Sequence, residues 1–385
     1  MRRIAAFLTV CCLMLCFYGA PAQDGDDSWV VVEEEYTPDV RYQAGVLMRH
    51  MTLREKICQM MFLCPENLTG ESYTTRWPEG GALAGCPAGG ILLFGQNIVS
   101  ETQLDELTAD ILRDAENAPF PPFLAVEEEG GAVSRIANKL GLSMQPSPKE
   151  LGESGQVENA ARAGREIGAY LSRFRINLDF APNADVLTEP QNELGSRCFG
   201  SDADTVSRMA LAFMSGLKES GVSACYQHFP GQGNATGKVY RGTARSKRTL
   251  EELMHCELIP FTDGIAAGVP MILVSHMTAR GLDEAKSASL SYTVMTGLLR
   301  NTLGFPGVII TESMRGKAFR GERKAGDLAV DCVLAGADML LLPEDAEDVV
   351  RGLTEAVEKG ILTEQRINES VERILMMKIG MRLIR

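Results

Sequence analysis

The sequence has little of what metal and nucleotide chemistry requires. It contains four histidines among 385 residues, and none of them stands in an HExxH pattern or beside a CxxC pair. This absence predicts no metal site. No GxGxxG fingerprint follows the first predicted strand, which argues against a dinucleotide. We therefore expect neither a metal nor an organic cofactor.

Positive charge is also in short supply. Lysine and arginine number 38 against 51 aspartates and glutamates, which gives a formal net charge of -13. An acidic surface repels phosphate backbones, so we expect no nucleic-acid partner. Hydrophobic residues make up 45% of the chain and charged residues 23%. This balance is typical of a packed globular protein and excludes a disordered, collagen-like or coiled-coil chain.

A long apolar run stands at the start of the chain. A basic start precedes an uncharged apolar stretch at 4–18, and Ala20 and Ala22 are small where a signal peptidase reads. The run is shorter than the ~20 residues of a spanning helix. We predict a signal peptide over 1–22, hence a secreted or extracytoplasmic protein with no membrane span beyond that segment.

Two alternatives remain for this first segment. Cys11, Cys12 and Cys16 suggest a lipoprotein, although Val10 and Leu15 are bulky where a lipidation motif has a small residue. An uncleaved signal that acts as a membrane anchor is the other alternative.

The cysteines beyond Ala22 form an odd and scattered set. They stand at Cys58, Cys64, Cys86, Cys198, Cys225, Cys256 and Cys332. Such a set is no disulfide framework, and a core of this size needs no cross-links. We expect most of these cysteines to be small buried hydrophobes, while Cys58, Cys64 and Cys86 could hold one bridge near the start of the fold.

From about Val40 the chain alternates between two patterns. Short apolar runs bounded by Gly, Pro or polar residues predict strands, and apolar residues at spacings of three and four predict helices. The predicted strands are Gln59–Leu63, Gly90–Phe94, Phe123–Glu127, Asn177–Ala181, Ser223–Phe229, Met271–His276, Val308–Glu312 and Met339–Leu342. The predicted helices are Thr102–Ala115, Val157–Phe174, Asp202–Ser220, Leu250–Gly268, Tyr292–Leu303, Gly326–Ala335, Glu344–Glu358 and Thr363–Met381.

This alternation predicts the fold. Eight buried strands, each followed by a helix, pair in parallel through right-handed crossovers. Eight such units close into a TIM-type (β/α)8 barrel, an α/β fold. We predict a single barrel domain over residues 41–385, preceded by an acidic linker at 23–40. An open doubly wound sheet is the alternative.

Polar residues gather at the carboxyl ends of the predicted strands, where barrel enzymes place their chemistry. The segments are EEEGG at 127–131, APNAD at 181–185, GSRCFG at 195–200, QHFPGQG at 227–233, SHM at 275–277 and TES at 311–313. Acids, bases and hydrogen-bonding groups that converge on one mouth suit a small polar ligand such as a sugar. Singly, each has a structural explanation: Arg197, for example, could tie its loop to a strand through Asp185.

These segments resemble glycoside hydrolase family 3, specifically its single-domain β-N-acetylglucosaminidase branch. The resemblance extends from about Met48 to Arg385 and follows the family order. The matching stretches are GGILLFGQNI at 89–98, AVEEEGGAVSRI at 125–136, NLDFAPNADV at 177–186, NELGSRCFGSD at 192–202, QHFPGQG at 227–233, VIITES at 308–313 and LAGADMLLLP at 334–343.

The resemblance implies a barrel that hydrolyses the O-glycosyl bond of terminal β-linked N-acetylglucosamine, often in cell-wall fragments, with retention of configuration. Retention needs a carboxylate nucleophile and a proton donor. The family's nucleophile, an aspartate, falls on Glu312. Its sugar-binding residues fall on Glu127, Arg197, Gln227 and His228. Its proton donor is an Asp-x-His dyad in the loop after the PGxG turn.

The sequence departs from the family most clearly in that loop. Residues 231–250 contain no Asp, Glu or His, and the dyad falls on Lys238 and Tyr240. A free lysine and a free tyrosine each have a pKa of ~10, so neither residue type is a ready proton donor near neutral pH. Losing general-acid help costs ~10²–10⁴ in rate.

Three further positions differ from the family pattern. Glu312 and Glu127 are each one methylene longer than the family's aspartates, and a displacement of ~1 Å can cost ~10²-fold in rate. Gln227 replaces a lysine, which removes a charged hydrogen bond worth ~1.5–3 kcal/mol.

Three functions remain open. The first is a barrel that binds sugar or cell-wall fragments with weak or lost hydrolysis, a pseudoenzyme in the limit. The second is a working retaining β-N-acetylhexosaminidase with Glu312 as nucleophile and a relocated donor, for which the candidates are Glu128, Glu129, Asp185 and Glu189. The third is a non-catalytic partner-binding protein.

Overall fold

The computed structural model describes residues 38–384, beginning with helix α1 (Pro38–Met48). The predicted signal peptide, and the linker as far as residue 37, lie outside the described residues. Among residues 38–384, none of the helices combines the length and the apolar character needed to cross a membrane.

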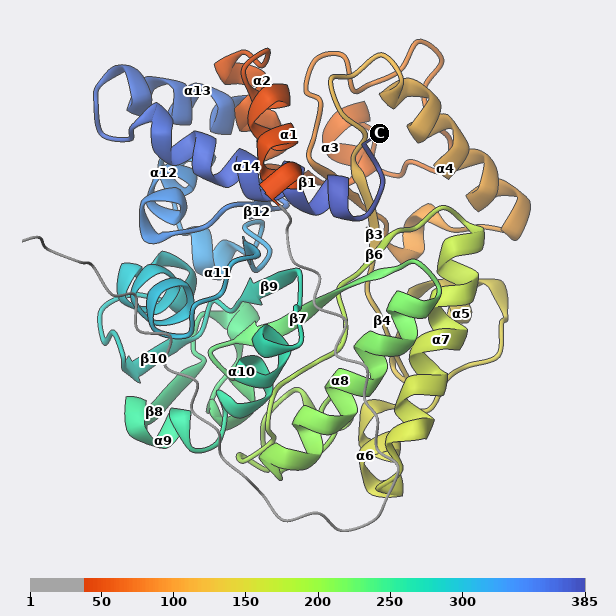
Figure 1. Ribbon diagram of the computed structural model, residues 1–385, viewed down its shortest axis with the longest axis vertical. Helices are drawn as coiled ribbons and strands as arrows, with labels where there is room; N and C mark the ends of the chain where they lie inside the picture. Colours follow the sequence, from red (N-terminus) through yellow and green to blue (C-terminus); the bar gives the residue numbers. More distant parts are fainter. Residues whose placement is uncertain (1–37, 385) are drawn as a thin grey trace, which may run out of the picture. The chain divides into compact units, whose positions relative to one another are not determined.

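Eight parallel strands form the central sheet (Figure 1). They are β1 (Met61–Leu63), β2 (Gly90–Leu92), β3 (Phe123–Val126), β6 (Leu178–Asp179), β7 (Ser223–Phe229), β9 (Met271–Val274), β11 (Val308–Thr311) and β12 (Leu340–Leu341). From β1 to β11 each strand pairs with the next in this series, and β12 pairs with β1. A parallel bridge between Ile310 and Met339 joins β11 to the start of β12 and closes the ring. The predicted TIM-type barrel is therefore confirmed, and the open sheet is excluded.

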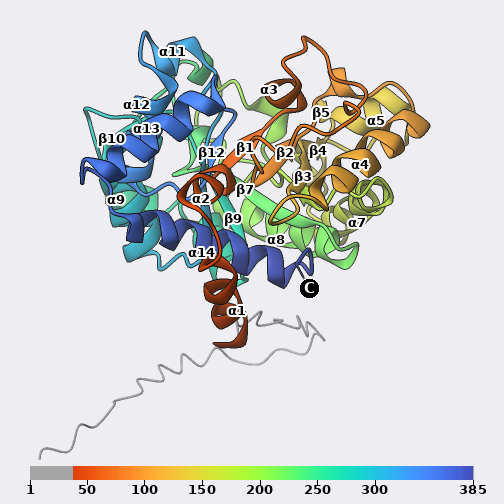
Figure 2. The same cartoon turned by 90° about the horizontal axis from the view of Figure 1, so that it is seen from above.

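Helices surround the strands (Figures 1 and 2). They are α2 (Leu53–Gln59), α3 (Pro65–Thr69), α4 (Glu101–Ala115), α5 (Arg135–Leu140), α6 (Pro148–Ser154), α7 (Val157–Arg173), α8 (Ala203–Glu219), α9 (Leu250–Met254), α10 (Ile259–Ala266), α11 (Lys317–Arg320), α12 (Ala325–Ala335), α13 (Ala346–Glu358), α14 (Glu364–Gly380) and η6 (Thr293–Thr302), which winds with π-type spacing. Figure 2 shows α3 and α11 on one side of the strands and α14 on the opposite side.

Capping residues set where several helices begin. The side chains of Ser100, Asp202, Asp345 and Thr363 each accept a hydrogen bond from the backbone three residues later, which satisfies a free amide of the first turn. The single helix predicted over Leu250–Gly268 is wrong, because α9 and α10 are separate. Proline is tolerated only in a helix's first turn, and Pro260 lies in the first turn of α10.

Aromatic side chains fill the space between the first strands. The ring of Phe62 packs face to face with Phe123 at 6.3 Å and edge to face with Phe180 at 5.3 Å. A Cβ atom on Gly90 would lie 2.3 Å from the ring of Phe62. Strand β2 therefore needs a glycine at this position to let the aromatic cluster form.

A second, small sheet covers the loop that follows β7. Strands β8 (Arg245–Thr249) and β10 (Thr278–Gly281) pair in parallel. A separate apolar cluster accompanies them, made of Ala235, Val239, Ala244, Met277 and Ala279. The sequence pattern did not predict this unit, which gives the loop with Lys238 and Tyr240 a fixed shape.

Candidate active site

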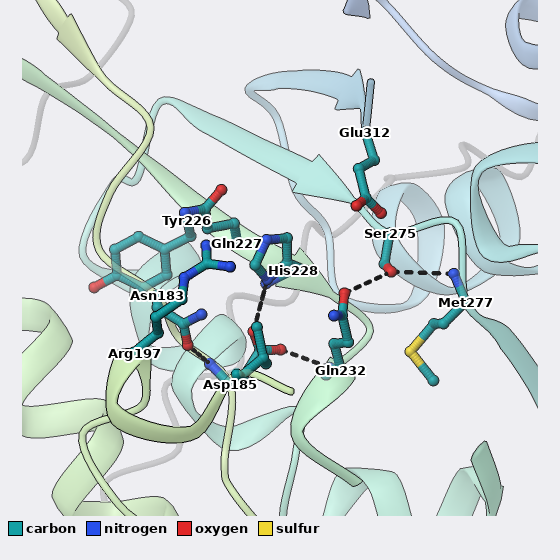
Figure 3. A network of polar contacts seen from close by, with 12 residues as sticks. Asn183, Asp185, Arg197, Tyr226, Gln227, His228, Gln232, Ser275, Met277 and Glu312 are labelled. Atoms are coloured by element: carbon teal, nitrogen blue, oxygen red, sulfur yellow. Dashed lines mark hydrogen bonds and ion pairs between the residues drawn. The ribbon is translucent and has the colours of Figure 1, made fainter. Parts of the chain in front are cut away.

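The predicted sugar-binding residues meet at the carboxyl ends of the strands. Glu127 directly follows β3, Gln227 and His228 end β7, and Glu312 directly follows β11. Figure 3 shows Arg197, from the loop after β6, near Gln227 and His228, with Glu312 on the far side of His228. The barrel thus gathers the residues that the resemblance singles out, although they lie up to 185 positions apart.

His228 is held by a buried carboxylate. Its Nδ1 lies 2.8 Å from Oδ2 of Asp185, and Oδ1 of Asp185 accepts from the backbone N of Gln232 at 2.5 Å. Burial lowers the pKa of His228, but the Asp185 carboxylate outweighs it, so the pKa is raised above the ordinary 6.5. Because Nδ1–H donates to Asp185, Nε2 is the imidazole atom left to meet a ligand.

The hydrogen-bond network around Asp185 joins residues that follow three strands (Figure 3). The side chain of Asn183 accepts from the Asp185 amide at 2.9 Å, and Gln232 Oε1 accepts from Ser275 Oγ at 3.0 Å. Ser275 Oγ in turn accepts from the backbone N of Met277 at 3.1 Å. Strand ends β6, β7 and β9 are therefore fixed to one another around His228.

Arg197 pairs with Glu129. Its Nε and Nη2 donate to the two oxygens of that carboxylate at 2.9 and 2.6 Å. The alternative partner considered from the sequence, Asp185, is wrong for the ion pair, because Asp185 is engaged by His228. The Glu129 side chain is 0% exposed and that of Arg197 28%. A buried acid therefore orients Arg197, while part of its side chain remains exposed at the mouth.

Gln227 also forms a hydrogen bond with the buried Glu129. Its Nε2 donates to Oε1 of Glu129 at 2.6 Å and to the carbonyl of Phe180 at 2.8 Å. The residue is 1% exposed. Gln227 thus makes a hydrogen bond that a lysine at this position could also make, but it brings no positive charge to the site.

Glu312, the nucleophile position, is half-buried, and its Oε2 accepts from the backbone N of His276 at 2.7 Å. The His276 ring is locked: Nδ1 contacts Ser289 Oγ at 2.6 Å, and Nε2 contacts the Ser313 carbonyl at 3.0 Å. It also stacks on Phe319 of α11 at 3.4 Å. Burial lowers the pKa of His276, although Glu312 opposes the shift. His276 therefore acts as a neutral brace for the segment that carries Glu312.

Glu127, predicted to hold a sugar hydroxyl, already has a cationic partner. Arg135 Nη2 donates to its Oε2 at 2.6 Å, and the Glu127 side chain is 27% exposed. Partial exposure leaves Glu127 at the mouth, but part of its hydrogen-bonding capacity is used by Arg135.

The acids named as relocated donors differ in how fully they are bound. Glu128 is buried and accepts from the amides of Ile136 and Ala137 and from the hydroxyl of Tyr170. Burial raises the pKa of Glu128, opposed by these hydrogen bonds. Glu189, which is half-buried, accepts from the amide of Gln191 at 3.1 Å.

At the dyad positions, Lys238 and Tyr240 pack on each other. The Lys238 ammonium lies 5.4 Å from the centre of the Tyr240 ring, and the guanidinium of Arg241 lies 5.6 Å from it. Tyr240 is 60% exposed. This cation–π cluster supplies neither a carboxylate nor an imidazole.

A carboxylate does reach this loop from elsewhere. Glu193 Oε1 accepts from the backbone N of Val239, between the two dyad positions, at 3.0 Å. Sequence reasoning did not identify Glu193, because it lies 46 positions away from Val239. Its place inside the matched stretch 192–202 was the one available signal.

A cavity of about 820 Å³ opens among the segments after β1, β11 and β12. Glu66, Cys86, Arg315, Lys324 and Glu344 are among its lining residues, and none of the predicted sugar-binding residues lines it. Within residues 38–384, no group of three His, Cys, Asp or Glu side chains is arranged to hold a metal ion.

Comparison with known proteins places this architecture in a family. Residues 52–377 match the glycosyl hydrolase family 3 N-terminal domain. The chain is 30% identical to Beta-hexosaminidase LpqI of Mycobacterium tuberculosis over 338 residues, 84% of this chain and 82% of that protein. It is 28% identical to Beta-hexosaminidase A of Pseudoalteromonas piscicida over 321 residues, 75% of this chain.

A solved structure agrees with the sequence relatives. The glycoside hydrolase family 3 β-N-acetylglucosaminidase from Paenibacillus sp. str. FPU-7 superposes with a TM-score of 0.81 at 30% identity, over 86% of this chain. The chain spans 53% of the Pseudoalteromonas protein and 63% of the Paenibacillus chain. Taken together with the closed barrel and the strand-end cluster, the match shows that this chain belongs to glycoside hydrolase family 3.

Proposed function

We propose that this protein recognises terminal β-linked N-acetylglucosamine-type sugars, in glycans or cell-wall fragments, and hydrolyses them weakly or not at all. Recognition is supported by Arg197 and His228, which buried acids orient toward the barrel mouth. Weak hydrolysis rests on one observation: the loop after β7 offers Lys238 and Tyr240, packed on each other, where the chemistry needs a proton donor.

The nearby acids offer little replacement. A carboxylate donates a proton well only if its pKa lies near the working pH and its oxygen reaches the leaving group. Glu129 is ion-paired with Arg197, and Asp185 is committed to His228 and the Gln232 amide. Glu128 is buried and bonded on both oxygens. Without a donor we expect hydrolysis to fall by ~10²–10⁴.

The decisive test varies the leaving group. The 4-nitrophenolate anion leaves readily without a proton, whereas the sugar alkoxide of a β-linked disaccharide does not. We expect slow release of 4-nitrophenol from its β-N-acetylglucosaminide, abolished in Glu312→Gln, and no cleavage of the disaccharide across pH 4–9. Efficient cleavage of both substrates with a bell-shaped pH profile would contradict the proposal.

A second experiment restores the Asp-x-His dyad and tests for a gain of activity. Lys238→Asp combined with Tyr240→His reintroduces an acid and an imidazole, and we expect disaccharide cleavage to rise toward the ~10²–10⁴ that general-acid help provides. Binding is followed separately through the melting temperature with N-acetylglucosamine. No turnover and no thermal shift in any variant would favour a partner-binding role instead.

A second candidate is a working retaining hydrolase with Glu193 as donor. The contact of Glu193 with the Val239 amide favours it, because this carboxylate lies at the dyad loop. In that case Glu193→Gln would abolish disaccharide cleavage while 4-nitrophenyl hydrolysis persists. Glu189→Gln tests the other half-buried candidate donor in parallel. Equal rates in wild type and Glu193→Gln would exclude Glu193.

We also propose that the chain is exported. The basic start, the apolar run at 4–18 and the small residues before Gln23 support cleavage after Ala22. Expression of the full chain in a bacterium with an intact secretion pathway should give an extracytoplasmic protein whose first residue is Gln23. Recovery of the uncut chain in the cytoplasm would count against export, and recovery of the uncut chain in the membrane would favour the anchor.

A further inference from the structure

Two thiols lie against each other beside the first strand of the barrel. Cys58 is in the last turn of α2, and Cys86 is in the coil that leads to β2. Their sulfur atoms are 2.9 Å apart, and both residues are buried. A disulfide bond needs ~2.05 Å, so the sulfurs would have to approach by less than ~1 Å.

Hydrogen bonds hold the segments that carry Cys58 and Cys86 against each other. Three hydrogen bonds fix the coil around Cys86 to α2. They run from Arg54 Nη2 to the Gly85 carbonyl (2.8 Å), from Gln59 Nε2 to the Pro87 carbonyl (2.8 Å) and from the Gly89 amide to the Cys58 carbonyl (3.0 Å). A Cβ atom on Gly89 would lie 1.9 Å from the Gln59 carbonyl oxygen, which shows how closely the segments pack. The thiols are therefore preorganised.

The remaining cysteines of the described chain are placed differently. Cys198, Cys225 and Cys332 are buried singly, and Cys256 is half-buried. Cys64 contacts Arg315 Nη2 at 3.1 Å and Asn67 Oδ1 at 3.3 Å, so its sulfur is already engaged by polar groups. Of the three cysteines near the start of the fold, the geometry singles out Cys58 and Cys86.

We propose that Cys58 and Cys86 form a disulfide bond when the chain meets an oxidising compartment. The oxidant is the disulfide of a thiol–disulfide oxidoreductase. Cys86 lines the 820 Å³ cavity and is 5% exposed, whereas Cys58 is 0% exposed, so Cys86 is the more accessible of the two thiols to an oxidant. Formation of this bond does not depend on the proposed sugar chemistry.

The exchange is balanced in two steps. The Cys86 thiolate attacks one sulfur of the oxidant, the oxidant's S–S bond breaks, and its other sulfur leaves as a thiolate. The Cys58 sulfur then attacks Sγ of Cys86, the mixed disulfide breaks, and the second oxidant sulfur leaves. The two protons of Cys58 and Cys86 end on the two released thiols, so the protein pair is oxidised and the oxidant is reduced.

The bond would close a loop between residues 28 positions apart that contains β1 and α3. Constraining such a loop restricts the unfolded chain and stabilises the fold. It would also fasten the wall of the 820 Å³ cavity, because Cys86 and Glu66 both line it.

The test counts thiols before and after reduction. The full chain, exported to an oxidising compartment, is denatured and alkylated with N-ethylmaleimide, then weighed by mass spectrometry. We expect two fewer adducts without prior reduction than with it, and a linked peptide pair that contains Cys58 and Cys86. Reduction of the folded protein should lower its melting temperature by roughly 4–8 °C.

Variants distinguish this pair from a bridge that involves Cys64. Cys64→Ser should keep the difference of two adducts, and Cys86→Ser should abolish both the difference and the melting shift. If Cys86→Ser fails to fold, oxidised glutathione added to reduced wild-type protein gives the same adduct count directly. Equal adduct numbers before and after reduction, or a difference that disappears in Cys64→Ser, would overturn the proposal.

Discussion

The barrel carries a charged cluster at each end, and the two are built differently. At the amino ends of β11 and β12, the buried Asp338 accepts from Arg300, Arg373, Ser370 and the Ile309 amide at 2.6–3.0 Å. Both its oxygens are bonded twice within the protein. The cluster ties η6 and α14 to the strands.

At the carboxyl ends the bonding is less complete. One guanidinium face of Arg197 is held by Glu129, yet the side chain is 28% exposed. Glu312 has one oxygen bonded, to the His276 amide. The side-chain nitrogen of Asn183 is buried without a partner. The polar groups of the Asp338 cluster use all their hydrogen-bonding capacity on one another. Several polar groups at the carboxyl ends of the strands instead keep hydrogen-bonding capacity for a ligand.

The largest effect on stability is expected at Asp338, at the amino ends of the strands. Asp338→Asn removes the buried charge that faces Arg300, Arg366 and Arg373, so we expect a loss of ~3–5 kcal/mol in the free energy of unfolding, measured in urea. Asp331→Asn is the matched control, since Asp331 pairs with Arg323 on the surface and should cost under ~1 kcal/mol. Similar losses of unfolding free energy in the two variants would show that the buried Asp338 cluster contributes no more to stability than a surface ion pair.

At the open end, binding should change more than stability. Arg197→Lys keeps the charge but loses the two-pronged contact with Glu129. We expect affinity for N-acetylglucosamine, measured by calorimetry, to fall roughly 10- to 100-fold, equivalent to ~1.5–3 kcal/mol. Arg165→Lys, whose exposed partner is Glu219, should leave affinity unchanged. An unaltered affinity in Arg197→Lys would remove this residue from the sugar site.

The His228–Asp185 pair predicts a pH dependence. Because the folded-state pKa of His228 is raised above 6.5, its contribution to stability is fully present below pH 6.5 and is lost as pH rises through the raised value. The difference in unfolding free energy between wild type and His228→Gln should therefore shrink between pH 6 and 9. His255→Gln, at an exposed position, should show no such trend. A constant difference would contradict the assigned pair.

The smallest effect is expected at Tyr240. Its ring meets Lys238 and Arg241 and is 60% exposed, so removing the hydroxyl in Tyr240→Phe should change stability by under ~0.5 kcal/mol. Release of 4-nitrophenol should also be unchanged. Disaccharide cleavage in the wild type that is lost in Tyr240→Phe, with 4-nitrophenol release unchanged, would identify the phenol as the donor.

The sequence predicted the barrel well because its signals are local. All eight strands are present where short apolar runs stand between Gly, Pro and polar residues, and Ser223–Phe229 matches β7 at both ends. The error at Leu250–Gly268 came from weighing apolar spacing above Pro260. The β8–β10 pair escaped notice, because its strands are polar and pair across 33 positions.

The sequence predicted which residues lie in the site but not which side chains they contact. Strand-end position and family resemblance indicated Arg197, His228 and Glu312, yet neither identifies the partner of a charged side chain. That Arg197 pairs with Glu129, and that Glu193 reaches Val239, depends on how loops from different strands fold over the mouth. Such contacts depend on tertiary packing, and residues that meet in this way have no characteristic spacing in the sequence.

The small β8–β10 sheet bears on how much change its loop tolerates. The unit has its own strands and its own apolar cluster, and it shares Leu282 with the main core, so we expect substitutions at its exposed positions to leave the barrel core intact. Under the proposed function, the dyad positions Lys238 and Tyr240 lie in this unit's loop, whereas the proposed sugar-binding residues Arg197 and His228 lie at the strand ends of the barrel. Changes confined to this one loop would therefore weaken the proposed hydrolysis without removing the proposed sugar binding.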